Sequence, residues 1–307
     1  MKAKSFRPSV LLAIAASALG LAISTAALPP AGPGGSTVTI TAIGKKEAPP
    51  TVAKDDVQLS LGKERKQVGT WVKAEKLYLA ILIDDSLDSE VASQWNDLRQ
   101  FIEAQPPTTS IAVGFATNAT VRVAQDFTTD HNLAAKALRI PLGTAAYSSP
   151  YLSVIDWMKR WPATGDRRSL LLISSGIDYF RGGFDPIYPD VDPAISIAEK
   201  GNINLWSIYY PGAGHLSRSF FRANNAQNNL SKLSEETGGE AFYLTTSAPV
   251  SFKPYLDELQ LHLNNQYLLT FAGDGGPKGK FANIRLKTEL AKVEFMHANQ
   301  AWLPPTK

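Results

Sequence analysis

The most constraining feature of this sequence is a continuous apolar run, Leu77 to Ile83, that ends directly in two aspartates. Such a run, without alternating polar residues, is typical of a strand buried on both faces of a parallel sheet. Two further segments read as buried strands, Leu170 to Ile173 and Ile203 to Tyr209, and the helix-like segments Val91 to Ile102 and Tyr151 to Trp161 lie between the first strand and the second. This alternation predicts an α/β fold with a doubly wound, mostly parallel sheet flanked by helices. Ligands of such sheets bind at the carboxyl ends of the strands, so the residues that follow these strands are the first candidates for a site.

The two ends of the chain have a different pattern. Val38 to Thr41 is β-branched, and the strand-like segments Gln266 to Phe271, Phe281 to Leu286 and Val293 to Phe295 stand near the other end. Short alternating segments separated by Gly, Pro and charged turns are typical of strands. We therefore expect a small β-rich extension formed by both termini.

The first residues predict export. Met1 to Arg7 is basic, Val10 to Ile23 is an unbroken apolar run, and the small residues Ser24 to Ala27 follow. This order is that of a secretory signal peptide. An uncleaved anchor is the alternative, but the run is shorter than the roughly 20 residues that a spanning helix needs. We expect an exported protein, periplasmic, cell-envelope or extracellular, with no stable membrane span after cleavage.

These patterns divide the chain into five parts. We expect a signal peptide over 1–27, a Pro/Gly linker over 28–36, a β-rich lead-in over 37–75, an α/β domain over 76–265 and a C-terminal β extension over 266–307.

Composition excludes several classes of site. The sequence has no cysteine, which rules out disulfides, thiolate zinc sites and a cysteine nucleophile. Removal of Lys2, Lys4 and Arg7 with the leader takes the net charge from +3 to zero. A neutral mature chain offers no basic face for nucleic acid. The four histidines do not pair at metal-ligand spacing, so we expect each of them, His262 included, to be a surface or helix residue.

Three oxygen-bearing residues follow the first buried strand. Asp84, Ser86 and Asp88 alternate, and alternate residues of an extended loop point the same way. Carboxylates and a hydroxyl form a hard-oxygen set suited to Mg²⁺, Ca²⁺ or Mn²⁺. The loop is therefore a candidate divalent-cation site.

This spacing resembles the metal-ion-dependent adhesion site of von Willebrand factor A domains, which reads Asp-x-Ser-x-Ser after the first strand. Leu142 to Tyr147 resembles the family's Gly-Thr-Ala-Leu-Tyr loop, with Thr144 at the position of a metal ligand. Leu171 to Gly176 is similar to the strand and turn that read Leu-Leu-Thr-Asp-Gly. With the flanking segments, the likeness extends over roughly residues 38 to 303 and is nearest to exported, VWFA-related proteins of acidobacteria.

The resemblance implies an exported, non-catalytic protein-binding module for adhesion or assembly. It implies a divalent cation, Mg²⁺ before Ca²⁺ or Mn²⁺, and a partner protein whose acidic side chain fills an open coordination position. Two positions depart from the family: Asp88 stands where it has Ser, and Ser175 stands where it has Asp. A swap of carboxylates between these positions is our hypothesis for the ligand set, which comprises Asp84, Ser86, Asp88, Thr144 and Ser175.

The rim around this loop is a candidate partner surface. Aromatic residues follow the second buried strand and either form a contact surface or pack down as a lid. The candidate contact residues are these aromatic residues together with Asp85: Asp85, Tyr179, Phe180, Phe184 and Tyr188.

Simpler structural roles remain open for the same residues. Asp88 or Ser89 can cap the following helix, Thr144 can be a turn residue, and Asp84 can be a buried carboxylate held by backbone amides. The alternative function is then a metal-free scaffold in an envelope assembly. A hydrolase that uses Asp84 or Asp85 with a metal-bound water is a third hypothesis, which the sequence supports least because no base, nucleophile and orienting residue occur together.

Overall fold

A computed structural model describes the chain over residues 35–44, 48–180, 186–214, 219–242, 245 and 247–306. The expected signal peptide, most of the expected linker, and Phe184 of the expected contact surface lie outside these residues.

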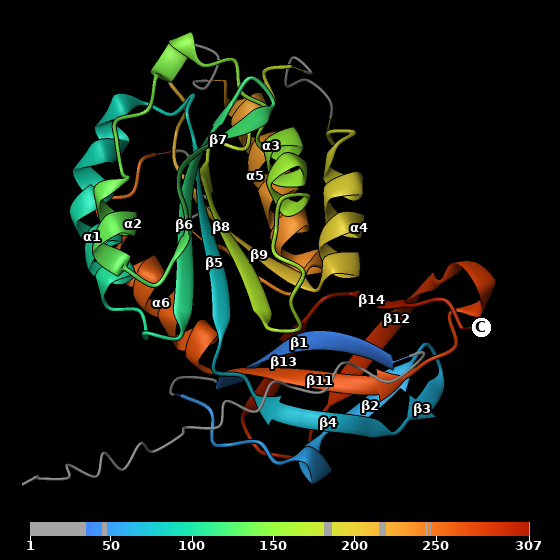
Figure 1. Ribbon diagram of the computed structural model, residues 1–307. Helices are drawn as coiled ribbons and strands as arrows, with labels where there is room; N and C mark the ends of the chain where they lie inside the picture. Colours follow the sequence, from blue (N-terminus) through green and yellow to red (C-terminus); the bar gives the residue numbers. More distant parts are fainter. Residues whose placement is uncertain are drawn as a thin grey trace, which may run out of the picture.

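A six-stranded sheet forms the centre of the α/β part (Figure 1). Its neighbouring strands are all parallel except the last pair, which is antiparallel. In spatial order the strands are β10 (Ala241–Phe242), β9 (Ile203–Tyr209), β8 (Arg167–Ser174), β5 (Leu77–Asp84), β6 (Thr109–Thr117) and β7 (Thr120–Thr128).

Helices cover both faces of this sheet, as Figure 1 shows. One face carries α1 (Trp95–Glu103), α2 (His131–Lys136) and α6 (Lys253–Asn264). The other carries α3 (Pro150–Met158), α4 (Val191–Gly201) and α5 (Phe220–Glu236). The expected doubly wound α/β fold, with its buried parallel strands, is confirmed.

The β-rich extension consists of two four-stranded sheets. One has the order β13 (Val293–His297), β1 (Gly35–Gly44), β11 (Gln266–Ala272) and β4 (Val68–Lys73). The other has the order β14 (Gln300–Leu303), β12 (Lys280–Lys287), β2 (Gln58–Leu61) and β3 (Glu64–Lys66). The two sheets share one apolar core, to which Ile40, Leu59 and Phe271 contribute buried side chains. Strands from both ends of the chain therefore interleave in each sheet.

Short 3₁₀ helices complete the structure. The segment from Val91 to Ile102, which has the apolar spacing of one helix, begins as a 3₁₀ helix and continues as α1. These 3₁₀ helices are η1 (Lys54–Asp56), η2 (Ser89–Gln94), η3 (Gly143–Ala145) and η5 (Gly276–Lys278). None of the helices in the described residues has both the length and the apolarity to cross a bilayer.

Candidate functional site

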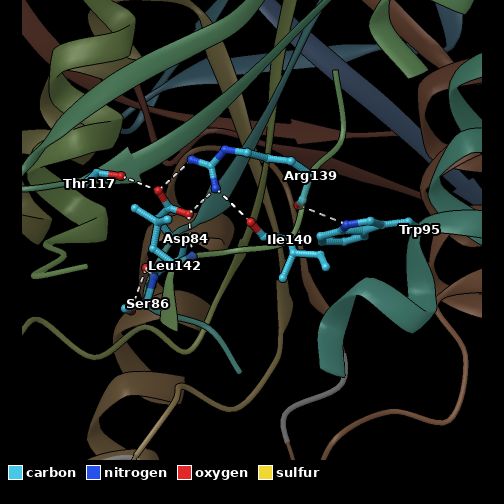
Figure 2. A network of polar contacts seen from close by, with 8 residues as sticks. Asp84, Ser86, Trp95, Thr117, Arg139, Ile140 and Leu142 are labelled. Atoms are coloured by element: carbon cyan, nitrogen blue, oxygen red, sulfur yellow. Dashed lines mark hydrogen bonds and ion pairs between the residues drawn. The ribbon is translucent and has the colours of Figure 1, made fainter. Parts of the chain in front are cut away.

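Asp84 is the last residue of β5, and its side chain is fully buried at the carboxyl end of the sheet. One carboxylate oxygen accepts hydrogen bonds from the Ser86 amide at 3.0 Å and from the Ser86 hydroxyl at 2.7 Å (Figure 2). The other oxygen accepts from the Ser174 hydroxyl at 2.7 Å. Burial raises the pKa of the Asp84 carboxyl, and these hydrogen bonds offset only part of the shift. Within the described part of the chain, no cationic side chain forms an ion pair with Asp84.

Asp85 has the opposite environment, although it is the next residue. Arg139 donates to both of its carboxylate oxygens at 2.7 Å, and the Thr117 hydroxyl donates at 2.6 Å (Figure 2). Burial alone would raise the pKa of Asp85, but the hydrogen bonds and the charge of Arg139 bring it below its usual value. Asp85 is also fully buried, so its expected role as a partner contact is wrong.

The ion pair fixes the loop that carries Thr144. The Leu142 amide donates to the Asp85 carboxylate at 3.0 Å, and the Gly143 amide donates to the Asp85 carbonyl at 2.9 Å. The Arg139 carbonyl in turn accepts from the indole N–H of Trp95 at 3.1 Å. Sequence reasoning missed Arg139, which is 54 residues from its partner. The signal in the sequence is Asp85 itself, because a carboxylate that is buried directly after a core strand needs a cationic partner elsewhere in the chain.

Ser86 and Thr144 meet at a small pocket on this rim. The pocket has a volume of about 220 Å³, and its lining residues are Ser86, Gly143, Thr144, Ala146, Tyr147, Tyr179, Ala213 and Gly214. The Ser86 carbonyl accepts a hydrogen bond from the Ala213 amide at 2.9 Å, which fixes the Ser86 loop against the segment that follows β9. The structure thus brings two of the expected ligands together above Asp84.

Asp88 and Ser175 are used differently. The Asp88 carboxylate accepts from the Glu90 amide at 3.0 Å and caps η2, which is the simpler role that the sequence left open. The buried Ser175 hydroxyl accepts from the Ile177 amide at 3.3 Å. Neither residue lines the pocket, so the swap of carboxylates between them gains no support.

A third buried carboxylate at this rim was not predicted from the sequence. Asp178 is fully buried, accepts from the Ser149 hydroxyl at 2.7 Å, and accepts from the Phe180 amide at 2.9 Å. Its charge and that of Asp84 both contribute to the raised pKa of Tyr151, after the larger effect of burial.

Aromatic side chains border the pocket. The rings of Tyr147 and Phe180 lie 5.1 Å apart and are 56% and 46% exposed. Tyr179 packs against Tyr147 at 6.5 Å. Tyr188 is fully buried against Tyr151, so its expected partner contact is wrong and the lid-like alternative describes it. Tyr147 was missed because the motif position drew attention to Thr144 alone.

The donor chemistry of this rim fits a divalent cation. A buried carboxylate without an ion pair in the described residues, beside hydroxyls at a pocket, is a hard-oxygen set that Mg²⁺, Ca²⁺ or Mn²⁺ would neutralise. Asp84, Ser86 and Thr144 are the residues that would hold it.

No protein-family model and no curated protein matches the sequence. Solved structures with a similar fold include an aerotolerance-related membrane protein from Bacteroides fragilis, which is 10% identical with a TM-score of 0.45 over 61% of this chain and 98% of that chain. A von Willebrand factor type A protein from Catenulispora acidiphila is 11% identical with a TM-score of 0.41 over 90% of this chain and 75% of that chain.

The von Willebrand factor domain of the type V pili tip protein Mfa5 from Porphyromonas gingivalis is 11% identical, with a TM-score of 0.42 over 64% of this chain and 96% of that chain. These likenesses are too distant to carry a function, and the narrower likeness to acidobacterial proteins stays a prediction. Two of these solved structures are von Willebrand factor A domains by name, the fold that the order of the chain's motifs predicts.

Proposed function

We propose that this chain is an exported, non-catalytic binding module that captures another protein at the rim formed by the carboxyl ends of β5 and β8. The observation that carries the proposal is the combination of a hydroxyl-lined pocket above the buried Asp84 with exposed aromatic rings beside it. Export is supported by the leader-like first residues.

The border of the pocket suits recognition of a protein surface. Tyr147 and Phe180 are large, exposed and adjacent, and aromatic side chains are the residue types most enriched where protein partners bind. Ile140 and Leu142, on the loop that Asp85 and Arg139 hold, are 59% and 47% exposed and extend the apolar area. The described lining residues are small or aromatic and uncharged, which favours apolar contact over charge steering.

A divalent cation would add a charged anchor to this surface. Held by Asp84, Ser86 and Thr144, it would supply a positive charge that accepts a carboxylate oxygen from the partner. The protein's own contribution is to keep Asp84 dry and to place the two hydroxyls at the pocket. The partner we propose is accordingly a protein that presents an acidic side chain next to an apolar one.

The cation is tested by thermal unfolding of the mature chain with Mg²⁺, Ca²⁺ or Mn²⁺ and with chelator. A cation at a hundred times its Kd stabilises by about 2.7 kcal/mol, which raises Tm by several degrees. Asp84→Ala should abolish the rise in Tm. Thr144→Ala should abolish it too, and because Thr144 is exposed, this substitution should not disturb the fold. Thr108→Ala, an exposed threonine near the opposite end of the sheet, is the matched control. A Tm that no cation moves would instead favour the metal-free scaffold.

The contact surface is tested with the double variant Tyr147→Ser, Phe180→Ser. Crosslinking of the wild-type chain in its native envelope should give a defined partner, and the double variant should lose at least nine-tenths of that product. Leu133→Ser on α2, which removes a 47% exposed apolar side chain elsewhere, should leave the product unchanged. Equal loss in both variants would contradict a contact at this rim.

A further inference from the structure

A histidine and two glutamates converge at a distance from the rim described above. Glu258 and His262 are four residues apart on α6 and so share one face of the helix. Glu240 joins them from the residue before β10. One ligand atom from each of the three lies within 4.8 Å of the others, and the His262 Nε2 is 3.2 Å from a Glu240 carboxylate oxygen.

The imidazole of His262 is held in a fixed orientation. Only 5% of the residue is exposed, and its ring stacks on Trp206 at 5.5 Å and on Phe242 at 6.5 Å, with interplanar angles of 16° and 15°. Burial in an aromatic stack restricts the ring, so the nitrogen that faces Glu240 needs no rearrangement to act as a ligand. His262 lies on helix α6, in keeping with the expected surface or helix residue, but it is buried in the core with one polar edge in a carboxylate cluster.

The cluster borders a cavity that is strongly acidic. The cavity has a volume of about 560 Å³, and its lining residues are Ile43, Gly44, Glu235, Gly239, Glu240, Glu258, His262, Glu294 and Met296. Four of these are glutamates, and none of the described lining residues is a lysine or an arginine. Glu294 reaches the cavity from β13 of the β-rich extension, whereas Glu240 and Glu258 belong to the α/β part. A divalent cation at this place would neutralise carboxylates that repel one another and would use the buried imidazole as a further ligand.

We propose that Glu240, Glu258 and His262 form a second metal site, specific for a divalent first-row transition metal such as Zn²⁺. An imidazole ligand favours Zn²⁺ and its neighbours over Mg²⁺ and Ca²⁺, which prefer an all-oxygen set. Three protein ligands leave positions for water, and Glu294 lies on the opposite wall of the same cavity. The site is separate from the Asp84 rim and goes beyond the proposed function.

The proposal is tested by titrating the untagged mature chain with Zn²⁺ alone and measuring heat of binding. The experiment uses an Asp84→Asn background, so that a cation at the rim cannot account for the signal. We expect one Zn²⁺ per chain. Glu258→Gln should weaken its affinity at least tenfold, and this exposed helix position carries little folding risk. Asp257→Asn removes one charge from the residue directly before Glu258 on the same helix. This control should leave the Zn²⁺ affinity within twofold of the parent value.

A second readout identifies the histidine. Zn²⁺ should shift the ring resonances of His262 in nitrogen-detected NMR and leave those of His131 unchanged. Mg²⁺ at the same concentration should shift neither. Loss of affinity in Asp257→Asn equal to that in Glu258→Gln, or Zn²⁺ binding with no change at His262, would overturn the site.

Discussion

Two adjacent aspartates at the end of β5 have opposite roles. The Asp85 carboxylate is paired with Arg139 and accepts from two further donors, whereas Asp84 is surrounded by hydroxyl and amide donors alone. Both are fully buried, so the first is a structural carboxylate held by its ion pair, and the second lacks an ion pair in the described residues and has a raised pKa because of its burial. One residue step along the strand separates them, because adjacent side chains of a strand point to opposite faces.

The Asp85–Arg139 pair should matter greatly for stability. Arg139→Met leaves a buried carboxylate unpaired, and we expect a loss of about 2–4 kcal/mol in the free energy of unfolding, since Arg139 itself is partly exposed. Urea denaturation followed by tryptophan fluorescence measures it. Arg160→Met, at the more exposed Asp156–Arg160 pair, should cost less than about 1 kcal/mol. Equal costs would show that the buried pair has no special weight.

The same pair gives a stability that depends on pH. Because the pKa of folded Asp85 lies below its ordinary 3.8, the pair stabilises the protein above pH 3.8 and loses this effect as the pH falls through the lowered value. The difference between wild type and Arg139→Met should therefore shrink below about pH 3.8. A difference that stays constant down to pH 2 would contradict this.

At the scale of elements, the strands were predictable and several helices were not. Leu77 to Ile83 is a continuous apolar run that lies within β5. Ile203 to Tyr209, which is apolar except for Asn204 and Ser207, coincides with β9. The turn between β6 and β7 contains Asn118 at a positive φ of 51°, a conformation that asparagine tolerates better than most residues. α4 was missed because its first turn contains Pro193 and follows a stretch of Pro and Asp that reads as a loop.

The turn after β8 depends on a glycine. Gly176 has a φ of 67°, and a Cβ there would lie 2.8 Å from the Ala226 carbonyl oxygen and from the Leu230 side chain. Gly176→Ala should therefore destabilise the protein by about 2–4 kcal/mol, by strain and overpacking against α5. Gly165→Ala, where a Cβ meets open space, should change the stability by less than about 0.5 kcal/mol. Thermal and urea unfolding of the two variants provide the comparison.

The residues of the candidate sites were predictable only where they stand close together in the sequence. Asp84 and Ser86 are two residues apart, so the loop was visible in the sequence. Arg139 and Asp178 come from other strands and loops, and only tertiary structure brings them to the rim. Glu258 and His262 have a readable helical spacing, but the arrival of Glu240 from β10 depends on how the sheet and α6 pack.

At the scale of the whole molecule, several polar contacts join the two parts of the fold, and one of them involves a buried carboxyl group. The Glu199 side chain at the end of α4 is 9% exposed and accepts from the Gln300 amide of β14 at 3.0 Å. Burial, with the charge of Glu236, raises the pKa of Glu199 from 4.5 to about 7, against the opposing Gln300 bond. Folded Glu199 therefore keeps its proton to a higher pH than the unfolded chain does.

This shift predicts a loss of stability as the pH rises. Between about pH 4.5 and 7 the unfolded chain releases the proton first, so the free energy of unfolding should fall by about 1–2 kcal/mol after allowance for solvent. Glu199→Gln imitates the protonated form and should remove this part of the slope. Glu103→Gln, on an exposed position of α1, should not. Urea unfolding at pH 5 and at pH 8 gives the free energy of unfolding for each variant. An equal change between the two pH values in wild type and in Glu199→Gln would contradict the role of Glu199.

The interleaved strands of the extension set an order of assembly. β1 pairs with β11 and β13, so the first described strand to be synthesised has its partners more than two hundred residues later. The central parallel sheet needs none of these later residues, and its last strand, β10, ends at Phe242. During synthesis, the central sheet can form before β1 is paired. Until then, the backbone N–H and C=O groups of β1 are unpaired, and such strand edges can pair with other chains. The first described strand to be synthesised is therefore among the last to be paired, because β11 and β13 must be synthesised before both of its edges are filled.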